Sequence, residues 1–150
     1  MKTIASFSVD HRGMEPGVYF REDVRAGAPV LTADLRFFRP NAGRYLTTTE
    51  AHTVEHMLAT CLRSSACADN IVYFGPMGCR MGFYLVTIGL SEDAVCRLLQ
   101  ETIALSLSME SVPGASEESC GNYRDLDLRD GVEALQAFLP KCVKRAYKPL

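Results

Sequence analysis

At 150 residues, with 47% hydrophobic and 23% charged residues, the chain has the composition of an ordinary globular domain. A formal net charge of -2 provides no strong positive field, which argues against nucleic acid or an anionic membrane surface as a partner. Residues 1–10 carry one lysine and no apolar run of signal-peptide length, and nowhere do about 18 apolar residues follow one another. We therefore expect a single domain over residues 1–150, located in the cytoplasm and without a membrane span.

The amino-terminal part of the chain predicts strands and then a helix. Extended segments are expected at 6–9, 18–21 and 30–38, separated by glycine and proline. A helical pattern runs from Thr47 to Ser65, where Thr47 and Glu50 have the spacing of a capping box. Its apolar stripe recurs at spacings of three and four and consists of Ala51, Val54, Leu58, Cys61 and Leu62.

The second half predicts two more strands and two more helices. Apolar, aromatic and branched residues at 71–74 and 79–90 favour strands. A helix is expected from Ser91 to a point before Pro113, with its buried stripe at Val95, Leu98, Leu99 and Ile103. The last helix is expected at 130–139, where Asp130 and Glu133 have capping-box spacing. The basic tail at 141–150 is expected to be a solvated or fraying end.

The six cysteines lack paired C-x-x-C spacing, and a chain without an export signal sits where thiols stay reduced. A disulfide framework is therefore not expected. Most of the six thiols are expected to be small buried residues.

The most informative motif is His52-Thr53-Val54-Glu55-His56. On a helix, residues four apart project from one face, at a separation that a single metal ion can bridge. At 100° per residue, Glu55 lies about 60° to one side of His52 and His56 about 40° to the other. The pattern therefore predicts a divalent-metal site with a carboxylate beside it that can act as a base.

Two imidazoles do not complete a catalytic metal site, which usually has three protein ligands and an open position. The residue pattern leaves several downstream donors open for the third ligand. Cys120 is favoured because Ser-Cys-Gly-Asn is a loop-like context. The alternatives are the carboxylates and Cys79, Cys96 and Cys142.

Cys79 lies in a second informative stretch, Gly75 to Tyr84, in which glycines flank the cysteine where a turn leads into a strand. Glycine lets the backbone approach a ligand closely, and Arg80 next to Cys79 is expected to lower the pKa of the thiol. A reactive thiol and an inert buried one are both compatible with this pattern.

The chain resembles the S-ribosylhomocysteine lyases, the LuxS-type enzymes that make the precursor of autoinducer-2. The matching blocks run in the family's order and close to its spacing: Ser6 to His11, Asp34 to Phe37, His52 to His56, Pro76 to Arg80, Gly82 to Tyr84 and Cys120 to Tyr123. The chain departs from the family where Tyr73-Phe74-Gly75 replaces an acidic-apolar-serine lead and where Met81 replaces a common threonine. These departures concern contacts to the homocysteine end of the substrate.

The resemblance implies an α+β fold, with a mainly antiparallel sheet packed against a few helices, and a homodimer whose pocket lies at the subunit interface. It implies that His52, His56 and Cys120 bind one divalent metal per subunit, with ferrous iron expected and zinc or cobalt as substitutes. Glu55 and Cys79 are implied as acid/base catalysts. The residues implied to line or support the pocket are Ser6, Phe7, His11 and Arg36.

The implied reaction cleaves the thioether of S-ribosylhomocysteine to homocysteine and 4,5-dihydroxy-2,3-pentanedione. The sugar carbonyl must migrate along the chain before β-elimination can expel the sulfur, and each migration is a proton abstraction followed by reprotonation. A Lewis-acidic metal stabilises the enediolates formed on the way. The resemblance leaves two roles open for this product, the precursor of a quorum-sensing signal or only the outlet of a methyl-cycle step.

Two other functions fit parts of the pattern. HxxEH is also the motif of inverted-type metallopeptidases, for which Glu133 is an available ligand. Against this, Glu133 is expected to cap a helix with Asp130, and the chain is short for a peptide-binding cleft. The other alternative is a structural zinc domain in which Cys79 completes a tetrahedron with His52, His56 and Cys120.

Overall fold

The computed structural model describes all 150 residues and has the expected α+β architecture, with one sheet and three α-helices. The strands are β1 (Gly17–Arg25), β2 (Ala28–Arg36), β3 (Ile71–Pro76), β4 (Gly82–Thr87) and β5 (Lys144–Arg145). The α-helices are α1 (Thr48–Arg63), α2 (Glu92–Ser106) and α3 (Leu128–Phe138). Short 3-10 turns are η1 (Ala5–Phe7), η2 (Ala68–Asn70), η3 (Tyr123–Asp125) and η4 (Leu139–Lys141).

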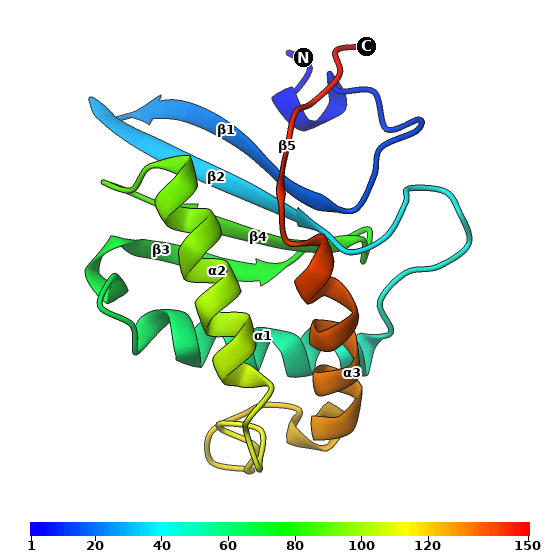
Figure 1. Cartoon of the computed structure of the whole chain (residues 1–150), viewed down its shortest axis with the longest axis vertical. Helices are drawn as coiled ribbons and strands as arrows, with labels where there is room; N and C mark the ends of the chain where they lie inside the picture. The colour runs from blue at the N-terminus through cyan, green and yellow to red at the C-terminus, as the bar shows by residue number, and fades with distance from the viewer.

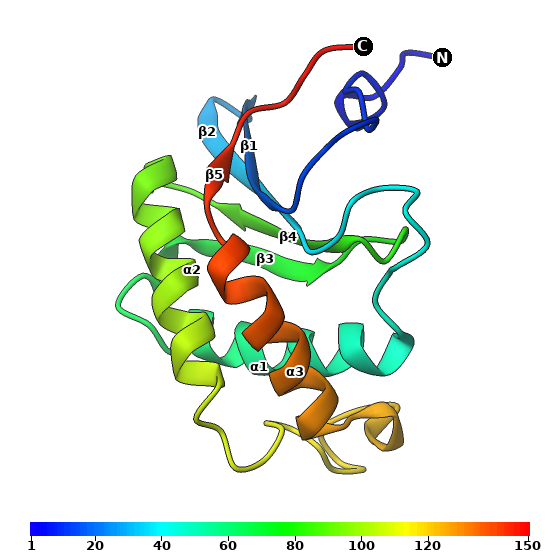
Figure 2. The same cartoon turned by 45° about the vertical axis from the view of Figure 1, so that its right-hand side comes forward.

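The sheet has the order β3-β4-β2-β1-β5. All pairs are antiparallel except β1 with β5, which is parallel. The helices α1, α2 and α3 lie together on one side of the sheet (Figures 1 and 2). None of the helices combines the length and apolar composition that crossing a lipid bilayer requires.

The core lies between the sheet and these helices. Leu31, Ala33 and Leu35 of β2 alternate toward it, and both expected helical stripes, those of α1 and α2, are buried. The predicted capping box at the start of α1 is present, since the Thr47 side chain accepts from the Glu50 amide and the Glu50 carboxylate accepts from the Thr47 amide. Sequence periodicity and capping therefore placed these two helices correctly.

Two expected elements differ from the structure. The segment at 6–9 is not a strand, because its first part forms η1, and only Val9 pairs, with Pro149. The last helix does not begin with a capping box of Asp130 and Glu133. Asp127 is the N-cap of α3 and accepts from the Asp130 amide, while Glu133 is ion-paired with Arg129 at 3.0 Å.

The carboxy-terminal tail is not a fraying end. After η4 it forms β5 beside β1 and then runs along the amino-terminal segment, so that the two chain ends lie near each other (Figures 1 and 2). The Asp10 amide donates to the Lys148 carbonyl at 2.8 Å, and the Leu150 amide donates to the Ser8 carbonyl at 3.3 Å. The tail therefore holds the amino-terminal segment against the rest of the fold.

The thiols are free, and only Cys61 and Cys142 are buried. The expectation that most cysteines are buried was therefore wrong. Periodicity identifies a buried cysteine within a stripe, as for Cys61. It gives no signal for the loop and turn positions of Cys67, Cys79 and Cys120.

Burial raises the pKa of the Cys142 thiol from 9.0 to about 12. Because the native thiol stays protonated where the unfolded one ionises, the free energy of unfolding should fall as the pH rises from about 9 to about 12. The Cys142 contribution to this fall should be about 1.4 kcal/mol per pH unit within that window. We expect Cys142→Ala to lose this part of the slope in urea unfolding at pH 9 to 11, whereas the half-buried control Cys67→Ala should keep it. Equal slopes in the two variants would contradict the assignment.

Candidate metal centre and active site

Helix α1 presents a polar stripe opposite its buried one. Thr49, His52, Thr53 and His56 follow one another at spacings of three, one and three, so they share one face of the helix. Thr53 is fully buried, and the two histidines are half-buried. The face is covered by the loop that leads into α3, because the Asp127 amide donates to the Thr53 hydroxyl at 3.0 Å.

The structure brings the three predicted metal ligands together. One ligand atom each from His52, His56 and Cys120 lies within 4.8 Å of the others. The Cys120 sulfur is 3.4 Å from Nε2 of His52, and the two imidazole centroids are 4.8 Å apart. A tetrahedral ion with bonds of about 2.0–2.3 Å holds its ligand atoms about 3.5 Å apart, so the cluster is close to that spacing. Two imidazoles and a thiolate are also the donors that late first-row divalent metals prefer.

Backbone groups orient two of these three side chains. Nδ1 of His56 lies 2.8 Å from the Pro113 carbonyl, which can only accept, so the proton is on Nδ1 and Nε2 is free to bind a metal. Gly114 follows in a left-handed conformation (φ 68°), and a Cβ there would lie 3.4 Å from the same nitrogen. The Asn122 amide donates to the Cys120 sulfur at 3.4 Å. The loop 107–127 therefore supplies both a ligand and its supports.

Cys79 is exposed at the turn between β3 and β4. It precedes the strand, which begins only at Gly82, and Arg80 beside it has a positive φ of 61°. The Arg80 side chain lies over the Tyr45 ring. Its guanidinium carbon lies 4.4 Å from the centre of the Tyr45 ring.

A hollow of about 480 Å³ joins Cys79 to two other predicted site residues, His11 and Arg36. The remaining wall is formed by the turn after β2 and by Met81: Pro40, Asn41, Gly43, Arg44 and Tyr45. None of the three clustered metal-ligand candidates lines it. Within one chain, the thiol and the metal cluster therefore belong to two separate groups.

Three predicted site residues join neither group. Ser6 and Phe7 lie in η1, near the chain ends and beyond the sheet (Figure 2), and the Phe7 side chain is 68% exposed. Glu55 is half-buried on α1, next to His56. Neither Ser6 nor Phe7 lines the hollow that contains Cys79.

Arg36 is held in place by a buried polar group that the sequence did not indicate. Its guanidinium donates to the Asp34 carboxylate at 3.3 Å, and the two side chains are 3% and 1% exposed. The Tyr147 hydroxyl donates to the same carboxylate oxygen from the carboxy-terminal tail. Burial, followed by the charge of Asp34, raises the pKa of Tyr147 above its ordinary range. The tail therefore supports the wall of the Cys79 hollow.

We expect Tyr147→Phe to destabilise the fold by about 1–3 kcal/mol, because it leaves a buried carboxylate with one donor fewer. Urea unfolding near neutral pH measures this loss. The exposed Tyr73 provides a matched control, since Tyr73→Phe removes the same hydroxyl from the surface. If both variants unfold at the same urea concentration as the parent, the Asp34 carboxylate does not depend on the tail.

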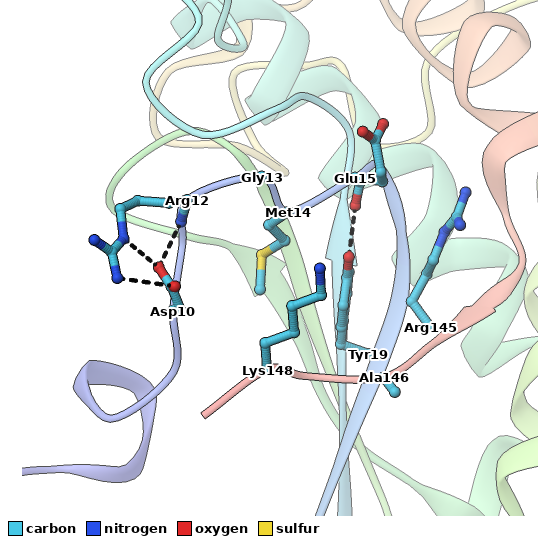
Figure 3. A pocket seen from close by; sticks show the side chains of 9 residues that line it. All are labelled: Asp10, Arg12, Gly13, Met14, Glu15, Tyr19, Arg145, Ala146 and Lys148. Carbon is cyan, nitrogen blue, oxygen red and sulfur yellow. Dashed lines mark hydrogen bonds and ion pairs between the residues drawn. The ribbon is translucent and has the colours of Figure 1, made fainter. Parts of the chain in front are cut away.

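A second hollow, of about 280 Å³, lies where the tail crosses the amino-terminal segment (Figure 3). Arg12 pairs with Asp10 through two hydrogen bonds at its edge, and Tyr19 donates to the Glu15 carbonyl at 2.8 Å. It contains none of the clustered metal-ligand candidates and no cysteine. The predicted metal ligands and the predicted catalytic thiol are therefore elsewhere.

Sequence reasoning missed Asp125, whose Oδ2 lies 3.5 Å from Nδ1 of His52. It also missed Thr49, whose hydroxyl donates to the other oxygen of Asp125 at 2.8 Å. The signal available was the continuation of the histidine stripe through Thr49 and Thr53. Nothing in the sequence indicated which carboxylate of the loop would face His52.

Comparison with known proteins agrees with this geometry. A family model described as S-Ribosylhomocysteinase (LuxS) matches residues 4–148. An S-ribosylhomocysteine lyase of Clostridium beijerinckii is 46% identical over 133 residues, covering 85% of this chain and 83% of the relative. The S-ribosylhomocysteine lyase of Borreliella afzelii is 42% identical over 135 residues, covering 85% and 84%, and that of Desulfotalea psychrophila is 44% identical over 133 residues, covering 85% and 83%. The chain therefore belongs to the S-ribosylhomocysteinase (LuxS) family.

Proposed function

We propose that the chain is a metal-dependent lyase that cleaves S-ribosylhomocysteine to homocysteine and 4,5-dihydroxy-2,3-pentanedione, the precursor of autoinducer-2. The observation that carries the proposal is the cluster of His52, His56 and Cys120, with donor atoms within 4.8 Å of one another, in a chain of this family. The substrate is the one named for these relatives, S-ribosylhomocysteine.

The three clustered side chains are the proposed ligands of one divalent metal per subunit. The donor set fits such an ion, because Nε2 of His56 is left free by the Pro113 carbonyl and the Cys120 sulfur faces Nε2 of His52. When bound, the metal supplies Lewis acidity that polarises a sugar oxygen. Ferrous iron is the ion we propose for the cell, with zinc or cobalt as functional substitutes.

Cys79 and Glu55 are the proposed proton carriers. Moving the sugar carbonyl requires a proton to leave one carbon and return to its neighbour, and a positioned acid/base contributes about 10²- to 10⁴-fold to each such step. Once the ketone is at the third carbon, loss of the adjacent proton breaks the carbon–sulfur bond. The sulfur leaves with the bonding pair and takes up a proton as homocysteine.

The separation of the thiol hollow from the metal cluster supports a pocket shared between two subunits. Cys79 shares its hollow with His11 and Arg36, while the metal cluster lies on α1 and the loop before α3. We propose a homodimer in which the hollow of one subunit faces the metal cluster and Glu55 of the other. Ser6 and Phe7, which lie in η1 near the amino terminus, are further proposed substrate contacts.

Mixing two inactive variants tests the shared pocket. The Cys79→Ala subunit keeps the metal cluster, and the Cys120→Ala subunit keeps the Cys79 thiol. A hybrid dimer therefore contains one pocket in which both the thiol and the metal cluster are intact. After random exchange of subunits, about half of the dimers are hybrids, and activity should recover to about a quarter of the parent's. No recovery from subunits shown to exchange would contradict a pocket built from two chains.

The function itself is tested by product release. Protein loaded with iron or cobalt is incubated anaerobically with S-ribosylhomocysteine, and the released homocysteine is titrated with a thiol reagent. We expect thiol to accumulate well above the no-enzyme control. Thiol at the level of that control would overturn the lyase assignment.

The two alternative functions have less support. The metallopeptidase needs Glu133 as a ligand, but this side chain is exposed and ion-paired with Arg129 on the outside of α3. The expectation that Glu133 caps the helix with Asp130 was wrong, since Asp127 is the N-cap and the Glu133 carboxylate pairs with Arg129. The structural zinc site needs Cys79 as a fourth ligand, and Cys79 lies in a hollow apart from the cluster.

A further inference from the structure

A carboxylate that the proposed reaction does not use lies against the metal cluster. Asp125 is at the end of η3, in the same loop as Cys120. Its Oδ2 is 3.5 Å from Nδ1 of His52, and the two side chains are 26% and 21% exposed. Its Oδ1 accepts a hydrogen bond from the Thr49 hydroxyl at 2.8 Å. One carboxylate therefore faces both a candidate ligand and a helix hydroxyl.

The spacing on α1 explains this arrangement. Thr49 precedes His52 by three residues, so its hydroxyl and the imidazole project from one side of the helix toward the same loop. Thr49 is in the first turn of the helix, where a nearby negative charge is also favoured by the helix dipole. Both features draw the Asp125 side chain to this end of the polar stripe.

The contacts of His52 assign different tasks to its two nitrogens. Nε2 faces the Cys120 sulfur at 3.4 Å, which places it on the side of the other candidate ligands. Nδ1 faces Asp125, and an ionised carboxylate only accepts, so it favours the tautomer with hydrogen on Nδ1 and a free lone pair on Nε2. The separation of 3.5 Å is longer than an ordinary hydrogen bond, so at this distance the effect is electrostatic orientation.

His56 achieves the same result by a different route, since its Nδ1 donates to the Pro113 carbonyl. The loop is already tied to α1 by the Asp127 amide on Thr53, so Asp125 is not needed for that attachment. We propose that Asp125 is a positioning residue for the metal centre, which orients His52 and selects its tautomer, and that Thr49 holds Asp125 in place. This inference rests on the proposed function, because it assumes that the cluster binds a metal.

The experiment measures metal affinity rather than turnover. Metal-free full-length protein is titrated with Zn²⁺ against a chromophoric chelator, and with Co²⁺ while the visible absorption spectrum is recorded. The variants are Asp125→Ala, Asp125→Asn, which keeps an acceptor oxygen, and Thr49→Val, which removes only the hydroxyl. Glu133→Gln is the control, since it removes an exposed carboxylate that is ion-paired on α3.

We expect Asp125→Ala to weaken Zn²⁺ binding about 10- to 100-fold and to alter the Co²⁺ spectrum. The Zn²⁺ affinities of Asp125→Asn and Thr49→Val should each lie between those of Asp125→Ala and the parent. The affinity and spectrum of Glu133→Gln should match those of the parent. This graded order is not expected if Asp125 merely fills space in the loop. In that case Thr49→Val, which replaces the hydroxyl by a methyl group of similar size, would leave the Co²⁺ spectrum unchanged.

The contrary outcomes separate the two levels of the proposal. Parent-like affinity and spectrum in Asp125→Ala would overturn the role of Asp125 and leave the metal centre standing. An equal loss of Zn²⁺ affinity in Glu133→Gln would also overturn the role of Asp125, because the effect would then come from net charge. Failure of the parent to bind one ion per chain would overturn the metal centre itself. If Asp125→Ala does not fold, a parent-like Thr49→Val spectrum overturns the role and an altered one supports it.

Discussion

Replacing Cys79 with alanine should leave one bound metal per chain and reduce homocysteine release by about 10²- to 10⁴-fold. The reason is the place of this thiol: it shares a hollow with Arg36 and His11 and lies apart from the clustered donors on α1. Metal content by atomic absorption and steady-state thiol release, measured on the same sample, give the two numbers needed.

Cys96→Ala is the matched control, because Cys96 is a half-buried thiol on α2 that belongs neither to the metal cluster nor to the Cys79 hollow. It should keep both metal and turnover. A Cys79→Ala protein that loses its metal would instead support the structural zinc site in which Cys79 is a ligand. Retention of full turnover would remove Cys79 from the mechanism.

Cys120→Ala should weaken metal binding about 100-fold or more, since it removes one of three protein donors from a small ligand set. His56→Ala should do the same, and turnover should fall with metal occupancy in both. Each of these two donors is individually held in place: Nδ1 of His56 donates to the Pro113 carbonyl, and the Asn122 amide donates to the Cys120 sulfur. Equilibrium competition with a chelator gives the affinity.

Ser119→Ala serves as the control for the loop, because Ser119 precedes Cys120 and its backbone amide, not its side chain, is hydrogen-bonded to Ser116. Its metal affinity should match that of the parent. Parent-like affinity in Cys120→Ala would mean that the third ligand is another side chain and that the observed cluster is not the metal centre.

Local signals in the sequence predicted α1 well. Thr47 and Glu50 cap it, and a 3.6-residue period buries one stripe and leaves the histidines on another. These are short-range effects that a helix carries wherever it is placed. The same holds for α2, whose N-cap Ser91 and acidic first turn are as expected.

Long-range contacts decided what the sequence left open. Asp127 and Asp130 each stand three residues before a possible capping partner. Asp127 is the N-cap of α3, because its amide is bound to Thr53 of α1. Gly131 then lets α3 approach α1, since a Cβ there would lie 2.6 Å from Thr53 and Met57 atoms. Neither contact can be derived from the local pattern of α3.

The site shows the same division. The two helical imidazoles follow from their spacing, and a loop cysteine was a reasonable third donor. Asp125, Pro113 and the Tyr147 support of Asp34 were not predicted, because each depends on a contact between residues far apart in the chain. The fixed tail was missed for the same reason. Its basic composition indicates a solvated end, but its pairing with β1, its backbone hydrogen bonds to the amino-terminal segment and the Tyr147 contact to a buried carboxylate outweigh that tendency.

The most direct test is a titration of metal-free protein with Co²⁺ in the absence of oxygen, with homocysteine release measured at each addition. We predict that activity rises linearly from a negligible value and reaches a plateau at one equivalent of Co²⁺ per chain, when the site formed by His52, His56 and Cys120 is fully occupied. Full activity before any metal is added, or one bound equivalent without release of homocysteine, would contradict the account.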